Sequence, residues 1–122
     1  MTNLTILVVQ TVLTSCLAGW MIFAVYNNWR FPRLNREAVG QVMRFELMER
    51  QYPEDYAVLR HRKITNPRLI GAAFGLILLV ETLSAVALSV GAILLLASLL
   101  GLVPVEAARL AAVIGTLLFI LT

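Results

Sequence analysis

Residues 69–101 read LIGAAFGLILLVETLSAVALSVGAILLLASLLG, a run of 33 residues in which Glu81 is the only charged side chain. A helix needs about 20 apolar residues to cross the roughly 30 Å hydrocarbon core of a bilayer. As a single helix the run would reach roughly 50 Å, so it must tilt, protrude or end before Gly101. We therefore predict a membrane span at about residues 69–98.

Two further runs flank this one. Residues 4–26 carry no charge and are followed by Trp29 and Arg30, which suit the headgroup level of a bilayer. Residues 105–122 follow a turn at Gly101 to Pro104 and contain only Glu106 and Arg109 as charges. At a spacing of three residues these two side chains are able to form an ion pair. The sequence thus predicts spans at about 4–26 and 105–122 as well.

The N-terminal run has a competing interpretation as a cleaved signal, because Leu13-Thr14-Ser15-Cys16 is similar to a lipoprotein cleavage box. A signal needs a basic residue before its apolar stretch and a stretch of only about 7–15 residues. Here no Lys or Arg precedes the run, which continues well past Cys16. A span with a small thiol in it is the better interpretation. As the single cysteine, Cys16 also excludes an intramolecular disulfide.

The composition agrees with a membrane location. Hydrophobic residues make up 60% of the chain and charged residues only 14%, whereas soluble domains carry roughly a quarter of charged residues. We predict an all-α, polytopic membrane protein, a helical bundle of three spans joined by a helical interfacial loop.

The net charge of +3 comes almost entirely from the polar segment at residues 27–67. Because short basic loops stay on the cytoplasmic side, this placement indicates membrane topology and not a nucleic-acid partner. We expect the loop to be cytoplasmic and the N-terminus to face the opposite side.

Within the loop, residues 36–51 read as a helix that Asn35 caps and Pro53 ends. Its apolar residues form two stripes at helical spacing, namely Leu34, Ala38, Val42 and Phe45, and Val39, Met43 and Leu47. Two stripes favour contacts with both lipid and protein. A solvated helix with ion pairs such as Glu46 with Arg50 is an equally good interpretation.

The start of the long span is marked by Asn66 and Pro67. Asparagine is a common helix cap, and proline suits the first helical position, where its missing N–H costs nothing.

Glu81 is an ionisable side chain about twelve residues into the span, where a charge is costly unless it is protonated or paired. It is either a site for proton or ion handling or a hydrogen-bonding contact to another helix, for example to Gln10 or Thr14.

The long span also has a face of small residues along its length. Gly71 and Gly75 have the small-xxx-small spacing that lets helices approach closely. The same face continues through Thr82, Ala85 and Ser89. We predict that these five residues pack against a helix.

The basic cluster Arg60, Arg62 and Lys63 would attract anionic lipid headgroups, although ordinary topogenic charge explains it as well. His61 beside it is the only histidine, so a haem or chlorophyll ligand inside a span is absent. No phosphate loop, metal-ligand spacing or nucleophile with a base is present. The sequence predicts neither catalysis nor a cofactor nor a metal.

The order of these elements resembles a family of small bacterial inner-membrane proteins known only as a domain of unknown function. The similar residues are Asn27-Asn28, Pro32, Asn35, Val42-Met43, Glu46, Arg62-Lys63-Ile64, Pro67, Glu81 and Gly91-Ala92. The resemblance implies a bacterial inner membrane and a fourth span beyond residue 122, so a longer full protein is expected. It implies no activity.

Two functions remain open. The small size and the absence of chemistry favour an accessory subunit that packs against a larger inner-membrane complex, respiratory, photosynthetic or transport, surrounded by membrane lipids. The alternative is a small homo-oligomeric transporter or channel that uses Glu81.

Overall fold

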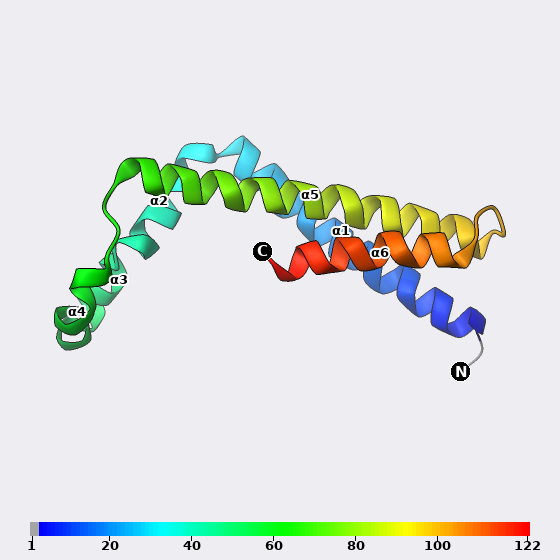
Figure 1. The fold of residues 1–122 in the computed structure, drawn as a ribbon, viewed down its shortest axis with the longest axis horizontal. Helices are drawn as coiled ribbons and strands as arrows, with labels where there is room; N and C mark the ends of the chain where they lie inside the picture. Colours follow the sequence, from blue (N-terminus) through cyan, green and yellow to red (C-terminus); the bar gives the residue numbers. More distant parts are fainter. Residues whose placement is uncertain (1–2) are drawn as a thin grey trace. The chain divides into compact units, whose positions relative to one another are not determined.

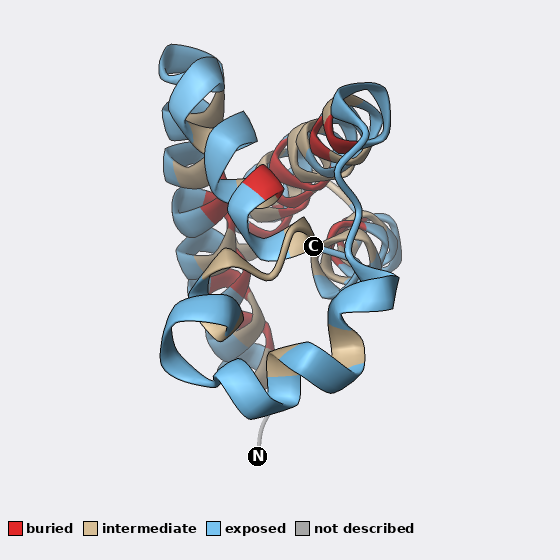
Figure 2. Cartoon of the chain, turned by 90° about the vertical axis from the view of Figure 1, so that its left-hand side faces the viewer, coloured by how far each residue is buried: buried red, intermediate tan, exposed pale blue. Residues whose placement is uncertain are grey.

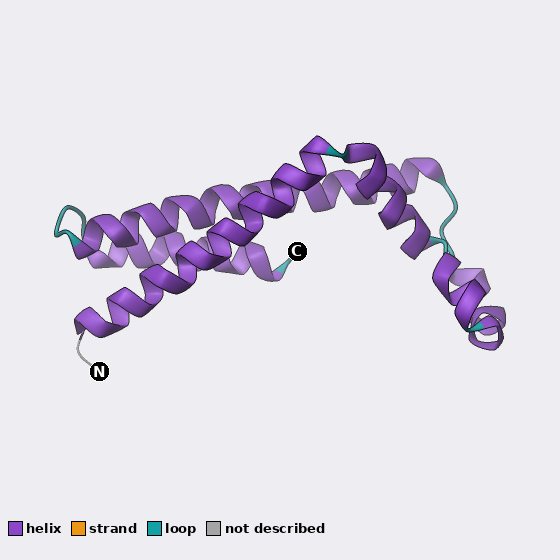
Figure 3. Cartoon of the chain, turned by 180° about the vertical axis from the view of Figure 1, so that it is seen from behind, coloured by secondary structure: helices purple, strands orange, loops and turns teal. Residues whose placement is uncertain are grey.

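The computed structural model describes residues 3–122, and these residues form helices without any strand (Figures 1 and 3). The all-α prediction is confirmed. The elements are α1 (Asn3–Arg30), α2 (Pro32–Met43), α3 (Glu46–Gln51), α4 (Pro53–Leu59), the short 3₁₀ helix η1 (Arg60–Arg62), α5 (Pro67–Leu99) and α6 (Val105–Ile120).

The chain divides into two compact units. The first holds residues 3–27 and 78–122, which are most of α1, the C-terminal part of α5, and α6. The second holds residues 28–77, with α2, α3, α4 and the start of α5. Each unit is described separately below.

Two helices, α1 and α5, are long and apolar enough to cross a membrane. Only 28% of the most apolar stretch of α1 and 22% of that of α5 is buried inside the protein. A core helix of a soluble protein would bury most of such a stretch, so these exposed apolar surfaces indicate contact with lipid. Two of the three predicted spans thus have helices of suitable length and composition.

The third predicted span forms the 16-residue helix α6. It reaches about 24 Å, which is less than the roughly 30 Å of the hydrocarbon core. A third crossing therefore stays a prediction.

The turn between α5 and α6 is a glycine-capped helix end. Gly101 has a φ of 72°, which glycine adopts without a steric penalty. Its N–H donates to the Ser98 carbonyl at 3.0 Å, and the Leu102 N–H donates to the Ala97 carbonyl at 2.9 Å. This Schellman pattern satisfies the last carbonyls of α5 and reverses the chain into α6.

Helices α5 and α6 pack through a seam of small residues. A Cβ at Gly91 would lie 2.8 Å from the Cα of Ala112, and one at Gly115 would lie 2.7 Å from the backbone nitrogen of Leu88. The Ser84 hydroxyl crosses the seam and donates to the Gly115 carbonyl at 3.4 Å. Only glycine allows such close backbone approach, so these two positions determine how α5 and α6 meet.

Helix α1 covers this pair of helices at two places. Leu7 contacts the cluster of Leu95, Ala108 and Ala112 near one end. Ala18 and Met21 lie with Ala85 and Leu88 further along α1. Buried residues accordingly form narrow stripes along the helices, while the other faces are exposed (Figure 2). The first unit is a three-helix bundle with an apolar exterior.

In the second unit, the predicted single helix at residues 36–51 is wrong. Helix α2 already begins at Pro32, with Phe31 at the cap position, and it ends at Met43. Asn35 lies inside α2, where its side-chain amide donates to the Phe31 carbonyl at 3.1 Å. Proline at the first position of α2 fixes a helical φ, which explains the earlier start.

The break between α2 and α3 lies at Arg44 and Phe45. Phe45 has a left-handed φ of 56°, and it caps α3. The Arg44 side chain donates to Glu37 in α2 and to Glu46 at the start of α3, the latter at 2.7 Å. One guanidinium therefore clamps the two helices across the break.

Pro53 begins α4 as well as ending α3, so the chain after residue 52 is more helical than predicted. It returns to α2 where the Ile64 N–H donates to the Met43 carbonyl at 2.9 Å. The predicted start of the long helix is confirmed, because the Asn66 side-chain oxygen accepts the Arg68 N–H at 2.9 Å and α5 begins at Pro67.

Candidate functional site

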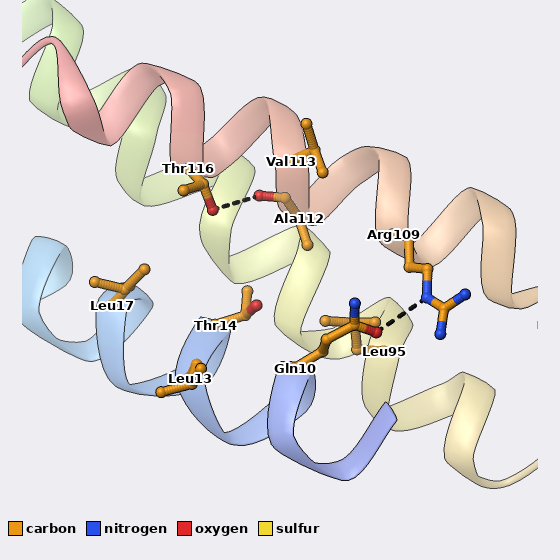
Figure 4. A pocket seen from close by; sticks show the side chains of 9 residues that line it. All are labelled: Gln10, Leu13, Thr14, Leu17, Leu95, Arg109, Ala112, Val113 and Thr116. Atoms are coloured by element: carbon orange, nitrogen blue, oxygen red, sulfur yellow. Dashed lines mark hydrogen bonds between the residues drawn. The ribbon is translucent and has the colours of Figure 1, made fainter. Parts of the chain in front are cut away.

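A groove of about 360 Å³ opens in the three-helix unit, lined mainly by α1 and α6 with Leu95 of α5 (Figure 4). Its walls are largely apolar, with Leu13 and Leu17 from α1 and Val113 from α6. The remaining lining residues are Gln10, Thr14, Arg109, Ala112 and Thr116. A groove of this kind suits a partly apolar molecule or chain.

Arg109 and Gln10 form the polar end of the groove. The Arg109 Nε donates to the Gln10 side-chain oxygen at 3.0 Å, which joins α6 to α1 (Figure 4). The Glu106–Arg109 ion pair that the spacing allows does not form in residues 3–122, where the ion pairs are those of Arg44. The guanidinium bonds across the bundle, because the partly buried Gln10 faces it from α1.

A second, more polar groove of about 370 Å³ also has Arg109 in its lining. Its lining contains Asn3, Glu106 and Arg109, together with Leu4, Leu7 and Val105. Arg109 thus belongs to both grooves. The second groove differs from the first in that it also contains the carboxylate of Glu106.

Two threonine hydroxyls at or near the first groove donate to carbonyls of their own helices. Thr116 donates to the Ala112 carbonyl at 2.8 Å, and Thr11 donates to the Leu7 carbonyl at 2.8 Å. Such bonds to the preceding turn hide a hydroxyl within its own helix. The polar character of the first groove therefore comes from Arg109, Gln10 and the hydroxyl of Thr14.

Glu81 lies in α5 and is half-buried. Gln10, one of its two predicted partners, accepts a hydrogen bond from Arg109. The role of Glu81 stays a prediction. The grooves described above do not contain it.

The predicted packing residues on α5 have different surroundings. Gly75 is exposed, and a Cβ there would meet nothing within 4 Å. At Gly71 the atoms nearest to a Cβ belong to the guanidinium of Arg36, the first at 2.8 Å, and this guanidinium donates to the Pro67 carbonyl at 2.9 Å. At Gly91 and Gly115 the nearest atoms belong to the backbone of a facing helix. Among the described residues, neither Gly71 nor Gly75 has such a neighbour. Their packing against a helix stays a prediction that needs a second chain.

The other three packing residues lie in the three-helix unit. Ala85 is buried beside Ala18. Thr82 donates to the Leu78 carbonyl at 2.6 Å, and Ser89 donates to the Ala85 carbonyl at 2.7 Å. These two hydroxyls donate to their own helix, as the two threonine hydroxyls near the first groove do.

The basic cluster is exposed at the end of η1. Arg60 and Arg62 belong to η1, and Lys63 follows it. The Lys63 ammonium donates to the Tyr56 hydroxyl at 3.0 Å, and this hydrogen bond raises the pKa of Lys63 above 10.5. All three residues are exposed, as the predicted lipid contact requires.

Some functional candidates were not foreseen from the sequence. In the part of α5 that faces α6, the buried residues are at 84, 85, 88, 91, 95 and 98, and all but residue 85 follow a mean spacing of 3.5. That spacing is typical of helices that pair along a seam. The Gln10–Arg109 contact joins residues 99 positions apart and leaves no local pattern. Among residues 3–122, no group of three or more His, Cys, Asp or Glu side chains is placed to hold a metal ion.

Two long helices with apolar exteriors, a small-residue seam and a basic loop define a helical integral membrane protein. A comparison with protein families matches residues 6–122 to the family described as "Predicted small integral membrane protein (DUF2165)". The chain belongs to this family, which confirms the resemblance noted in the sequence. Searches among curated proteins and among solved structures give no match.

Proposed function

We propose that the protein is a non-catalytic accessory subunit that packs laterally against a larger complex in the membrane. The main support for this proposal is a contrast between two pairs of glycines in α1, α5 and α6. The space beside Gly91 and Gly115 is occupied by the backbone of a facing helix of the same chain, whereas the space beside Gly19 and Gly75 is open.

Glycine inside a helix costs about 1 kcal/mol relative to alanine, so an outward glycine needs a reason. In a membrane the usual reason is a helix that approaches closely, because apolar side chains alone gain little over lipid tails. Gly19 follows the exposed Ser15 at a spacing of four, and Gly75 follows Gly71 in the same way. Ser15 and Gly19 offer a small-xxx-small surface to a helix of another chain, whereas at the second pair only Gly75 is open, because Arg36 lies against Gly71.

The surrounding architecture supports the same role. We propose three crossings in a bacterial inner membrane, with the loop at 27–67 in the cytoplasm. Helix α6 contacts α5 from Leu99 through Ala85, since Val105 and Phe119 pack against the two clusters of the bundle. It therefore shares the depth of the C-terminal half of α5, and the basic loop meets the positive-inside rule.

The first experiment is purification from native membranes in a mild detergent, followed by mass spectrometry of the proteins that remain bound. We expect stoichiometric subunits of one larger respiratory, photosynthetic or transport complex. Recovery as a homo-oligomer alone would contradict the proposal.

Two variants locate the interface. Gly75→Leu and Gly19→Leu should each abolish or reduce co-purification, because leucine holds an approaching helix away. A Cβ at either position meets no atom of this chain within 4 Å, so the protein should still fold. Ile77→Phe is the matched control, since it adds bulk to the opposite side of α5. Equal partner recovery for Gly75→Leu, Gly19→Leu and Ile77→Phe would exclude both glycine surfaces.

A second candidate function, a small homo-oligomeric transporter, is favoured only by Glu81, a half-buried ionisable residue in the middle of α5. Glu81→Gln should stop proton-coupled flux in reconstituted vesicles if Glu81 carries protons. An accessory subunit should tolerate the change, because glutamine still forms hydrogen bonds.

A further inference from the structure

The two grooves that share Arg109 match the two parts of a phospholipid, an apolar chain and a charged headgroup. The groove lined by Leu13, Leu17 and Val113 is mainly apolar, and the groove that contains Glu106 combines two charged side chains with apolar ones. Each is open and of similar size, about 360 Å³ and 370 Å³. A molecule that filled both would need an apolar chain, a group that binds arginine, and a further polar end.

Arg109 is placed to bind an anion. The bond to Gln10 uses one of the five N–H donors of a guanidinium. The two terminal nitrogens point away from Gln10 in Figure 4. Arg109 is the fifth residue of α6, so it lies only about 6 Å from the start of that helix. At this depth near the end of the bundle, a phosphate oxygen is a fitting partner for a guanidinium.

Glu106 adds a second requirement. It lies three residues before Arg109, so both side chains are on one face of α6 with Cβ atoms about 5–6 Å apart. They line the same polar groove, and among residues 3–122 no ion pair joins them; the bond of Arg109 goes to Gln10 instead. A neighbouring cation and anion that are not paired with each other complement a headgroup with the opposite charges at similar spacing.

We propose that this pair of grooves is a binding site for a glycerophospholipid with a primary ammonium beside its phosphate, that is, a phosphatidylethanolamine. The phosphate binds Arg109, the ammonium binds Glu106, and one acyl chain lies along Leu13, Leu17 and Val113. From Arg109 to Thr116 the groove follows α6 for about 10 Å, which accommodates the upper part of an acyl chain.

The headgroup chemistry separates this lipid from others. Phosphatidylglycerol offers the phosphate but no cation for Glu106. Phosphatidylcholine carries a methylated ammonium that cannot donate a hydrogen bond to a carboxylate. Phosphatidylserine brings a second carboxylate, which Glu106 would repel.

The test is native mass spectrometry of the whole protein, released from nanodiscs that contain equal amounts of dioleoyl phosphatidylethanolamine, phosphatidylglycerol and phosphatidylcholine. We expect one phosphatidylethanolamine to remain bound, in about tenfold excess over each competitor, as for one charge-assisted hydrogen bond. Equal retention of the three lipids, or preference for phosphatidylglycerol or phosphatidylcholine, would overturn the proposal.

Three variants divide the site into its parts. Arg109→Gln should lose all three lipids, and Glu106→Gln should keep lipid but lose the preference for phosphatidylethanolamine over phosphatidylglycerol. Val113→Trp fills the apolar groove without touching the charges, so it should reduce retention even if Arg109→Gln misfolds. Leu110→Ala, at an exposed position outside both grooves, is the control. Lipid retention in Arg109→Gln or Val113→Trp as strong as in Leu110→Ala would place the lipid elsewhere.

Discussion

Arg44 determines how the polar loop turns. Its guanidinium donates to Glu37 before the break and to Glu46 after it, and the bond to Glu46 is the main cause that raises the pKa of Arg44. The same bonds hold Phe45 in the left-handed region, which an L-residue avoids unless its surroundings compensate. One long side chain thereby replaces the glycine or asparagine that such a turn usually contains.

Arg44→Gln should loosen this turn, because neutral glutamine cannot serve two carboxylates. We expect the amides of Phe45 and Glu49 to exchange hydrogen at least several-fold faster, as measured by mass spectrometry in detergent. Arg50→Gln is the matched control, since Arg50 is exposed at the end of α3. Identical exchange in the two variants would mean that Arg44 does not hold the turn.

Lys63 gives a prediction with a defined pH range. The Tyr56 hydroxyl raises its pKa, so the stabilisation from this bond is complete below the ordinary lysine pKa and is lost as pH rises through the raised value. Tyr56→Phe should return the pKa of Lys63 toward 10.5, as followed by NMR of labelled lysine. Tyr52→Phe, which changes an exposed tyrosine at the start of α4, should leave the pKa unchanged.

At the scale of elements, the contact between α5 and α6 depends on backbone proximity. Gly91→Leu or Gly115→Leu would push side-chain atoms into backbone, because a Cβ at either position would already lie within 3 Å of the facing helix. Overpacking of this kind costs about 1–3 kcal/mol or more, so both variants should lower the thermal unfolding midpoint in detergent.

Gly75→Leu is the control for that comparison, because the same substitution meets open space there. Its midpoint should stay close to that of the unchanged protein. A midpoint as low as that of Gly91→Leu would show that the stability of the bundle does not arise from the seam.

The elements differ in how far the sequence predicts them. Long apolar runs predict α1 and α5 directly, and Asn66 with Pro67 predicts the start of α5, because each depends on neighbouring residues. The break at Phe45 was missed, since it depends on the reach of Arg44 to two carboxylates. The expected role of Asn35 as a cap failed for a related reason, because Pro32 had already begun the helix.

The candidate site was predicted less completely than the fold. Composition and charge identify a membrane protein, and Glu81 and the outward Gly75 could be singled out along the sequence. The grooves could not, because they form where residues about a hundred positions apart, such as Gln10 and Arg109, meet across the bundle. Contacts at that separation depend on how the helices pack and leave no periodic signal.

For the whole molecule, the proposed topology places Leu102 on the periplasmic side of the membrane and Arg50 and Thr122 on the cytoplasmic side. Single cysteines at these positions, in a Cys16→Ser background, should differ in their labelling by a membrane-impermeant maleimide, according to the side of the membrane on which they lie. Leu102→Cys should react in intact cells, whereas Arg50→Cys and Thr122→Cys should react only after permeabilisation. Labelling of Thr122→Cys in intact cells would contradict the third crossing.

The short connection at Gly101 makes α5 and α6 a single unit for membrane insertion. Only residues 100–104 separate the two helices, and α6 alone is short and carries Glu106 and Arg109. Charged residues in a segment of that length weigh against its independent insertion into lipid. Paired with α5 through the seam, α6 gains backbone contacts at Gly91 and Gly115 as it inserts. During biosynthesis α5 should therefore wait at the insertion machinery until α6 has been made, and the two should enter as a hairpin.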